Sequence, residues 1–366
     1  MNPLDGLDDQ QRAAAEVVRG PVAILAGAGT GKTRTITHRI AFGVADGTYT
    51  PNRVMALTFT SKAAGELRGR LRAMDVVGVQ AKTFHAAALA QLNFFWPTVA
   101  GDTAPSIVDN KVRLLAHAAD SLRLRPDTGT LRDVAAQIEW RKVTMRPIDE
   151  YAALGRSVGS IGADALVELM SAYERLKDER RQLDFEDVLL ACAGMIESEP
   201  RVAVAVREQY RHFTVDEYQD VSPLQNRLLE LWLGERRDVC VVGDASQTIY
   251  SFAGASSYDL LGFADEFAPL SADINLAGLP FDPADRTVRE PCPGGVAEPG
   301  RLPEAGFRPP GWRADQPHRV RHGRRRGGRR GRGDRPSGGA RGGAAGVRGA
   351  DAAQRAAAGG VRGVAA

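Results

Sequence analysis

The chain has 366 residues, enough for two or three domains, and a hydrophobic content of 43% that supports a sizeable core. It contains no apolar run long enough to cross a membrane, and its acidic, polar N-terminus does not resemble a signal peptide. The three cysteines, Cys192, Cys240 and Cys292, have no metal-binding spacing, which favours a reduced, cytoplasmic setting.

The formal net charge of +3 conceals two regions of opposite charge. Residues 277–366 contain 18 arginines, no lysine and eight acidic residues, whereas acidic side chains outnumber basic ones in residues 1–276. The basic end is rich in Arg, Gly, Ala and Pro and lacks hydrophobic periodicity, so it cannot build a core. We expect it to be disordered.

A glycine-rich loop, AGAGTGKT, occupies residues 26–33. The apolar residues 21–25 predict a buried strand before it, and residues 34–40 predict a helix after it. This order is typical of a phosphate-binding loop, in which backbone N–H groups and the positive end of the helix face phosphate oxygens. A chance glycine-rich turn is the alternative. The expected nucleotide-binding residues of this segment are Ala26, Gly27, Ala28, Gly29, Thr30, Gly31, Lys32, Thr33 and Arg34.

Two further predicted strands end in polar side chains that fit the same chemistry. Asp216 follows a strand-like stretch and is suited to hold Mg²⁺ together with Thr33. Glu217 can orient and deprotonate the attacking water, Lys32 can reach the β- and γ-phosphates, and Gln247 can contact the γ-phosphate. A solvated acidic surface is the alternative for the acid pair. Because the carboxyl ends of parallel strands share one edge, we expect the three motifs to converge on one crevice.

Together and in this order, AGAGTGKT, DEYQD (216–220) and GDASQTIYSFAGAS (243–256) resemble the motifs of superfamily 1 DNA helicases of the UvrD/Rep/PcrA type. The resemblance covers residues 4–276. Other strings that resemble motifs of this family are LDDQQRAAAEVV (7–18), ALTFTSKAAGELRGRL (56–71), AKTFHAAAL (81–89) and LDFEDVLL (183–190).

The resemblance implies an α/β fold of the P-loop NTPase (RecA-like) type, with a parallel sheet flanked by helices and an inserted helical subdomain. It implies an ATP- and Mg²⁺-dependent 3′–5′ helicase that moves along single-stranded DNA and binds DNA junctions. Gln11 would bond the adenine edge. The residues expected to contact single-stranded DNA, the last two by stacking on bases, are Phe59, Thr60, Thr83, His85, Tyr250 and Phe252.

Each of these DNA positions also has a purely structural interpretation. Phe59 lies in an alternating stretch typical of a half-buried strand, where it would be a core residue. His85 fits an interior histidine, and Tyr250 and Phe252 have the spacing of one face of an extended segment. We assign the aromatic residues 94–96 to helix packing rather than to DNA contact.

We expect residues 1–98 and 183–276 to form two segments of one ATP-binding motor domain. Residues 99–182 interrupt it with apolar residues at helical spacing, as the family's inserted subdomain does. This subdomain carries basic residues that fit either a solvated helix face or contact with DNA phosphates, namely Arg141, Lys142 and Arg146.

The next motif of the family, which reads approximately RDYRSTPQIV-x-x-AN, does not follow residue 276. Residues 277–291 read AGLPFDPADRTVREP instead. Codons for this stretch can be chosen so that a frame displaced by one base translates as RDYRSTPQIVRFAN. We infer a frameshift near Ala277, and GC-rich DNA read out of frame also accounts for the lysine-free composition that follows. The alternative is a genuine Arg/Gly tail that binds nucleic acid.

In the family, the displaced motif supplies an aromatic residue that stacks on adenine and an arginine that meets the γ-phosphate. We therefore expect a helicase by family whose present chain is impaired in hydrolysis and unwinding. The alternative is a non-catalytic fragment that binds ATP and DNA.

Overall fold

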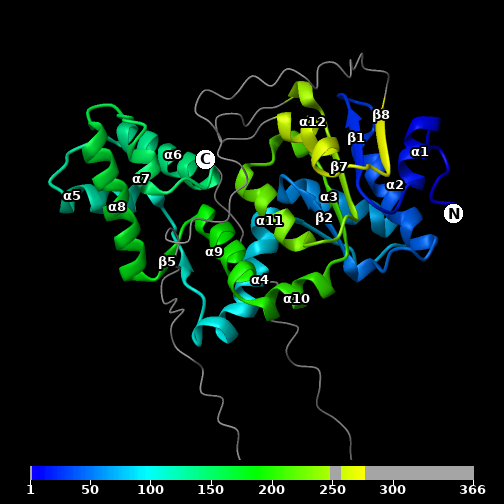
Figure 1. Ribbon diagram of the computed structural model, residues 1–366, viewed down its shortest axis with the longest axis horizontal. Coiled ribbons are helices and arrows are strands. Elements are labelled where there is room, and N and C mark those ends of the chain that lie inside the picture. Colours follow the sequence, from blue (N-terminus) through cyan, green and yellow to red (C-terminus); the bar gives the residue numbers. More distant parts are fainter. Residues whose placement is uncertain (1, 248–256, 277–366) are drawn as a thin grey trace, which may run out of the picture. The chain divides into compact units, whose positions relative to one another are not determined.

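The computed structural model describes residues 2–247 and 257–276 (Figure 1). The expectations for Tyr250, Phe252 and residues 277–366 lie outside the described residues. In chain order, the elements are α1 (Asp9–Glu16), β1 (Val22–Ala26), α2 (Lys32–Ala45), η1 (Pro51–Arg53), β2 (Val54–Thr58), α3 (Ser61–Ala73), β3 (Gln80–Thr83), α4 (Phe84–Ala100), β4 (Ser106–Ile107), α5 (Lys111–Ser121), α6 (Thr128–Val143), α7 (Ile148–Ala152), α8 (Ala163–Arg180), β5 (Gln182–Leu183), α9 (Phe185–Ser198), α10 (Pro200–Gln209), β6 (His212–Val215), η2 (Tyr218–Asp220), α11 (Pro223–Leu233), β7 (Val239–Gly243), η3 (Ala245–Gln247), α12 (Ser257–Glu266) and β8 (Ala272–Leu276).

A six-stranded sheet with the order β3-β2-β6-β7-β1-β8 forms the centre of the fold (Figure 1). Every neighbouring pair of strands in it is parallel, with register partners such as Met55 and Phe213, or Val22 and Cys240. The predicted α/β fold with a parallel sheet flanked by helices is therefore confirmed. All six strands end at one edge of the sheet, so the loops that follow them lie along that edge.

Helices cover both faces of this sheet, and alternate strand residues point to opposite faces. On one face, Met55 and Leu57 belong to a core formed with α4, α9 and α11. On the other face, Val54 and Ala56 belong to a core formed with α1, α2 and α3. Because both faces are covered, β2 and β7 are buried at every residue.

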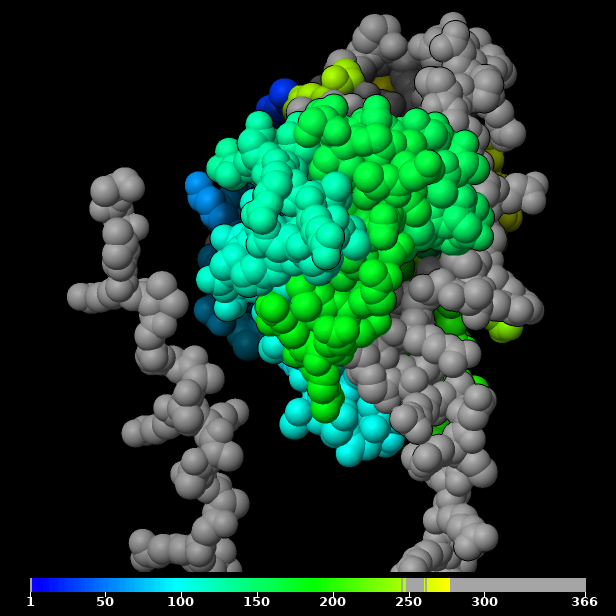
Figure 2. Space-filling view, turned by 90° about the vertical axis from the view of Figure 1, so that its left-hand side faces the viewer, coloured from blue at the N-terminus to red at the C-terminus, as the bar shows by residue number. Residues whose placement is uncertain are grey.

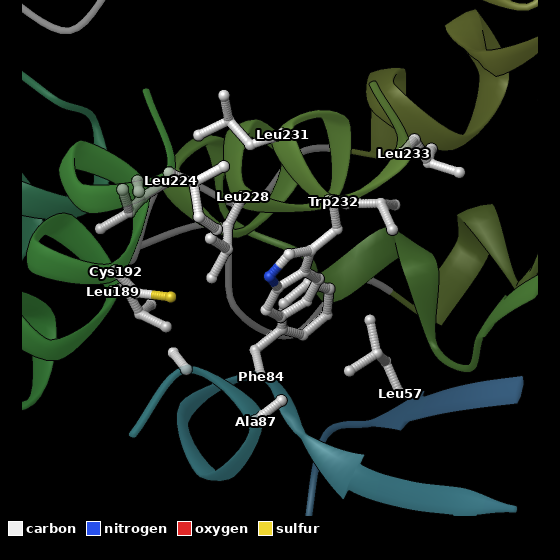
Figure 3. Packing of buried hydrophobic residues seen from close by; sticks show 14 of the residues in the cluster. Leu57, Phe84, Ala87, Leu189, Cys192, Leu224, Leu228, Leu231, Trp232 and Leu233 are labelled. Atoms are coloured by element: carbon white, nitrogen blue, oxygen red, sulfur yellow. The ribbon is translucent and has the colours of Figure 1, made fainter. Parts of the chain in front are cut away.

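The first of these cores surrounds Trp232 of α11 (Figure 3). Its indole ring stacks on Phe84, with ring centroids 5.9 Å apart, and on Phe213 at 6.2 Å. The indole N–H donates a hydrogen bond of 2.8 Å to the side-chain oxygen of Gln91, so the buried polar atom of the ring is satisfied.

The aromatic residues 94–96 are only partly packed as predicted. Trp96 is fully buried and donates from its indole nitrogen to Asp102 at 3.0 Å. Phe94 is 75% exposed, so its assignment to helix packing is wrong. Helical geometry explains the difference, because residues 94 and 96 lie about 200° apart around α4 and cannot share a buried face.

Residues 106–183 form a helical segment, α5 to α8, whose side chains make up the nearest part of the surface in Figure 2. This segment has a hydrophobic core of its own, with Leu115, Val134, Leu169 and Tyr173 all buried in it. The short parallel pair of β4 and β5 joins the two ends of the segment. The sequence did not predict that pair.

A buried group of charged residues lies where the helical segment meets α9. The Lys142 ammonium contacts the carboxylates of Asp187 at 2.6 Å, Asp184 at 2.8 Å and Glu174 at 3.0 Å. Lys177 also pairs with Asp187. Burial would raise the pKa of the Asp184 carboxyl, but Lys142, Lys177 and Lys111 outweigh it and hold that pKa well below its ordinary value.

This group corrects both interpretations of the basic residues in the helical segment. Lys142 is 2% exposed, and Arg141 is buried with its guanidinium 3.1 Å from Glu174. Neither side chain is a solvated helix face or free to meet DNA phosphate. The guanidinium of Arg146 lies over the ring of Trp140, with its central carbon 5.5 Å from the ring centroid.

Candidate nucleotide-binding site

The glycine-rich loop follows β1 and leads directly into α2. Ala26 is the last residue of β1 and is buried, which explains why a small residue stands there. Gly31 caps the N-terminus of α2 with a φ of +85°, a left-handed conformation that favours glycine. The Thr30 hydroxyl donates to the Gly27 carbonyl at 2.9 Å and closes the loop. The structure thus has the predicted strand, loop and helix N-terminus in sequence.

Gln11 lies against this loop. Its side-chain N–H donates to the Thr30 carbonyl at 3.0 Å, and its own backbone N–H donates to Asp8 at 2.8 Å as part of a capping box on α1. A Cβ on Gly31 would stand 2.7 Å from the Gln11 amide nitrogen, so the two residues are in close approach. The amide expected to contact adenine is therefore fixed beside the phosphate-binding loop.

Lys32 and Glu217 come from different strand ends and meet directly. The Lys32 ammonium lies 2.9 Å from the Glu217 carboxylate, although the two residues are 185 positions apart. Glu217 adopts a left-handed backbone conformation with φ of 52°, which is unusual for a non-glycine residue and turns the chain at the end of β6. Such strain is common at functional sites.

Asp216, directly after β6, has a carboxyl with a perturbed pKa. Burial and the neighbouring Glu217 raise the pKa of its carboxyl to about 6, and Lys32 offsets this only in part. A carboxylate and the Thr33 hydroxyl are hard oxygen donors of the kind that Mg²⁺ takes alongside phosphate oxygens and waters. The residues present therefore fit Mg²⁺. Among the described residues no group of three or more His, Cys, Asp or Glu side chains could hold a metal without such help.

A chain of hydrogen bonds links this centre to Gln247. The Gln219 side-chain N–H donates to Glu217 at 2.9 Å, and its oxygen accepts from the backbone N–H of Asp244 at 3.0 Å. The Asp244 carboxylate accepts from the Gln247 amide at 2.6 Å. Lys32, Glu217, Gln219, Asp244 and Gln247 thus form one network across the ends of β1, β6 and β7.

Sequence reasoning did not single out Gln219. It is 1% exposed, and its amide joins the β6 loop to the β7 loop. A Cβ on Gly243 would stand 2.5 Å from the Gln219 oxygen, so the glycine allows this approach. The available signal was its place within DEYQD, two residues after Glu217.

Arg34 contacts the segment before α1. Its guanidinium donates to the Gly6 carbonyl at 2.5 Å, and the side chain is exposed. This contact holds the segment before α1 against the start of α2. The expected role of Arg34 in nucleotide binding stays a prediction.

Four of the residues expected at DNA lie at the same edge of the sheet, where β2 and β3 end. Thr60 and Thr83 cap α3 and α4, each hydroxyl accepting from a backbone N–H, at 3.1 Å and 3.2 Å respectively. Phe59 is 38% exposed, so the alternative in which it is a core residue is wrong. Strand β2 ends one residue earlier, at Thr58.

His85 is half-buried, and its ring meets that of Phe185 edge-on with centroids 5.8 Å apart. Burial lowers the pKa of this histidine below its ordinary value. Phe185 itself is 60% exposed, which is unusual for a large apolar side chain. Phe185 lies within the string LDFEDVLL, but its exposure could not be predicted because it stands at the start of an apolar helical run.

A comparison with known families identifies the family to which the chain belongs. The model for the UvrD/REP helicase N-terminal domain matches residues 7–268. The chain belongs to this family. Its membership accounts for the order of the strand-end motifs around one edge of the sheet.

Two curated relatives show how much of the chain is similar to known UvrD/REP proteins, and at what identity. The ATP-dependent DNA helicase UvrD2 of Mycobacterium tuberculosis is 50% identical over 285 residues, which cover 74% of this chain and 41% of that protein. The ATP-dependent DNA helicase PcrA of Leuconostoc citreum is 31% identical over 269 residues, covering 72% and 36% respectively. The chain thus spans about two fifths of the length of the curated relatives it matches.

Two observations relate to the expectation of a reduced, cytoplasmic setting for this UvrD/REP chain. No helix among the described residues is both long enough and apolar enough to cross a membrane. Cys192 and Cys240 are buried and unpaired. Cys292 lies outside the described residues.

Proposed function

We propose that the chain carries the ATP-binding motor domain of an ATP-dependent 3′–5′ DNA helicase that translocates along single-stranded DNA. In this proposal, residues 1–98 and 183–276 form the motor domain and residues 99–182 its inserted subdomain. The observation that carries the proposal is the hydrogen-bonded network from Lys32 to Gln247, because it joins three strand-end motifs at one edge.

In this proposal ATP lies on the glycine-rich loop, with Gln11 at the adenine and Lys32 at the β- and γ-phosphates. Mg²⁺, held by Thr33 and Asp216, would neutralise charge that develops on the phosphates. Lys32 would exchange its contact with Glu217 for phosphate oxygens, and this exchange would leave the Glu217 carboxylate free to take a proton from water.

Gln247 would move when its side chain contacts the γ-phosphate. Gln219, which is hydrogen-bonded to both the β6 and the β7 loop, would transmit that movement between them. Because the same edge of the sheet carries the residues proposed for DNA, a shift of these loops would reach them directly. The residues proposed to contact single-stranded DNA, at junctions as well as on free strands, are Phe59, Thr60, Thr83, His85, Tyr250 and Phe252. The cytoplasm, where DNA and ATP are both available, is the proposed location.

A second candidate is a fragment that binds ATP and DNA without turnover. The observation that favours it is the displaced-frame motif at residues 277–291, which would otherwise supply an aromatic residue and an arginine to the ATP cleft. We propose that residues 277–366 are read out of frame and that ATP turnover is impaired as a result. Sequencing the gene across codons 270–295 tests the frame directly.

Turnover separates the two candidates. In a frame-corrected chain, DNA-stimulated ATP hydrolysis is expected to be far above that of the present chain. Glu217→Gln in the corrected chain should abolish hydrolysis and keep ATP binding, because the amide has the same shape but cannot take a proton. Glu235→Gln, at an exposed position outside the site, is the matched control and should hydrolyse ATP normally. Equal, strong hydrolysis by the corrected and present chains would refute the proposed impairment.

A further inference from the structure

The edge of the sheet opposite the nucleotide loop contains a pocket of about 620 Å³. Arg19 precedes β1, Arg211 precedes β6, His212 begins β6, and Asp238 precedes β7. Since the strands are parallel, these amino-terminal ends lie at the edge away from Lys32 and Gln247. Arg207 of α10 and Arg236, which follows α11, complete the basic part of the lining.

The charge of this pocket is strongly unbalanced. Four arginines line it, and the acidic side chains among its lining residues are Glu208 and Asp238. Asp238 already accepts a hydrogen bond of 2.9 Å from the Gly20 backbone N–H. Within residues 2–247 and 257–276, no carboxylate pairs with any of the four arginines, although other arginines of the chain do form ion pairs.

Two of the arginines are held in place at the inner part of the pocket. Arg207 donates through Nε to the Leu231 carbonyl at 3.1 Å, and Arg236 donates through Nε to the Leu233 carbonyl at 3.4 Å. Each Nε bond fixes the guanidinium plane and leaves the terminal nitrogens for another acceptor. Burial, Arg211 and Arg207 together lower the pKa of Arg236, and Asp238 offsets this only in part, as expected where cations outnumber carboxylates.

Buried polar atoms in this pocket lack partners. Nη2 of Arg236 and Nδ1 of His212 are buried, and neither makes a hydrogen bond to any described residue. Behind His212, whose ring centroid is 4.3 Å from that of Tyr49, lies the fully buried Arg39. Its guanidinium donates to the Tyr49 hydroxyl and the Val17 carbonyl and so remains without a carboxylate. Unpartnered buried polar atoms are rare in proteins, and these two belong to residues that line the pocket.

We propose that this pocket is a second anion site, which binds phosphate groups independently of the glycine-rich loop. Guanidinium groups present planar pairs of N–H donors that match phosphate oxygens, and a doubly charged phosphate would offset the excess of cations. The exposed Arg19 and Arg211 would receive the ligand at the rim, and Arg207 and Arg236 would bind it inside. The phosphate can belong to a free polyphosphate or to a nucleic-acid backbone, which share the same oxygens.

The test follows the ring resonances of His212 by NMR in the full chain, assigned by comparison with His212→Gln. Sodium pyrophosphate and a short single-stranded oligothymidylate are titrated separately. Saturable shifts of His212 with pyrophosphate assign the site to phosphate groups in general. Shifts with the oligonucleotide alone assign it to a nucleic-acid backbone, and either result supports the site.

Variants make the assignment specific. Arg19→Gln combined with Arg211→Gln should weaken binding at His212 at least tenfold, and both positions are exposed, so folding should be preserved. Arg72→Gln combined with Arg180→Gln removes the same charge from exposed positions elsewhere and should leave binding unchanged. Lys32→Ala should also leave it unchanged, because that residue belongs to the other phosphate site. The proposal is overturned if neither titrant shifts His212, or if the Arg19 and Arg211 variant binds as the native chain does.

Discussion

Replacing Lys142 by methionine should destabilise the fold strongly, although the residue is far from the nucleotide site. Methionine retains the length and apolar stem of the side chain but removes the ammonium. Three carboxylate contacts of 2.6, 2.8 and 3.0 Å are lost, and all lie at a side chain that is 1% exposed. Asp184 and Asp187 are then left buried with fewer compensating charges.

The magnitude follows from the burial of the group. Removing one partner of a buried ion pair costs about 3–5 kcal/mol, because the remaining charge stays buried and uncompensated. Lys177 still contacts both Asp184 and Asp187, so the lower end applies, and we expect a loss of about 3 kcal/mol in the free energy of unfolding. For a domain of this size that loss lowers the melting temperature by about 6–12 °C.

Thermal and urea unfolding followed by circular dichroism measure this loss. The matched control is Arg125→Met, which breaks an ion pair with Asp120 whose side chains are 87% and 62% exposed. Exposed pairs contribute little, so the control should stay within about 0.5 kcal/mol of the native chain. Equal stability of the two variants would refute the buried-network account. A loss of DNA affinity without a loss of stability would instead favour a DNA-facing Lys142.

Three further predictions concern the strand-end loops. Gln219→Met should lower the free energy of unfolding by about 1–3 kcal/mol, because the buried Asp244 N–H loses its acceptor. Urea denaturation measures this change, and unchanged stability would contradict the network. Phe59→Ala should weaken oligothymidylate binding by about 1–3 kcal/mol in a fluorescence titration if a base stacks there, whereas unchanged affinity would remove Phe59 from the DNA surface. Burial lowers the pKa of His85, so its contribution to stability is present above the unfolded-state pKa of about 6.5 and is lost as the pH falls below it. His85→Asn should therefore flatten the decline in stability below that pH, and a parallel decline in both proteins would contradict the assignment.

Local sequence patterns were sufficient to predict the strands and loops at the edge of the sheet that carries the glycine-rich loop. The apolar runs before Ala26, Asp216 and Gly243 each form a strand buried on one or both faces, and the parallel topology then places the following loops together. Short-range signals of this kind depend on residues within one element. The predicted convergence of Lys32, Glu217 and Gln247 follows from topology alone.

The partners of buried charges could not be predicted in the same way. Lys142 meets Asp184 and Asp187, which lie 42 and 45 positions further along the chain. A helical pattern indicates that Lys142 stands on a helix but not which segment covers it. The exposed Phe185, which pairs with His85 across 100 positions, is a similar case, because its contact depends on how α4 and α9 pack.

The central claim is that residues 26–33 and the acids after β6 form an ATP site. Binding of a fluorescent ATP analogue in the presence of Mg²⁺, compared between the native chain and Lys32→Ala, tests it most directly. The exposed Lys62→Ala is the control for loss of one positive charge. The account predicts at least tenfold weaker binding for Lys32→Ala, equivalent to about 1.4 kcal/mol or more, and native affinity for Lys62→Ala. Unchanged affinity in Lys32→Ala would contradict the assignment of the phosphate-binding loop.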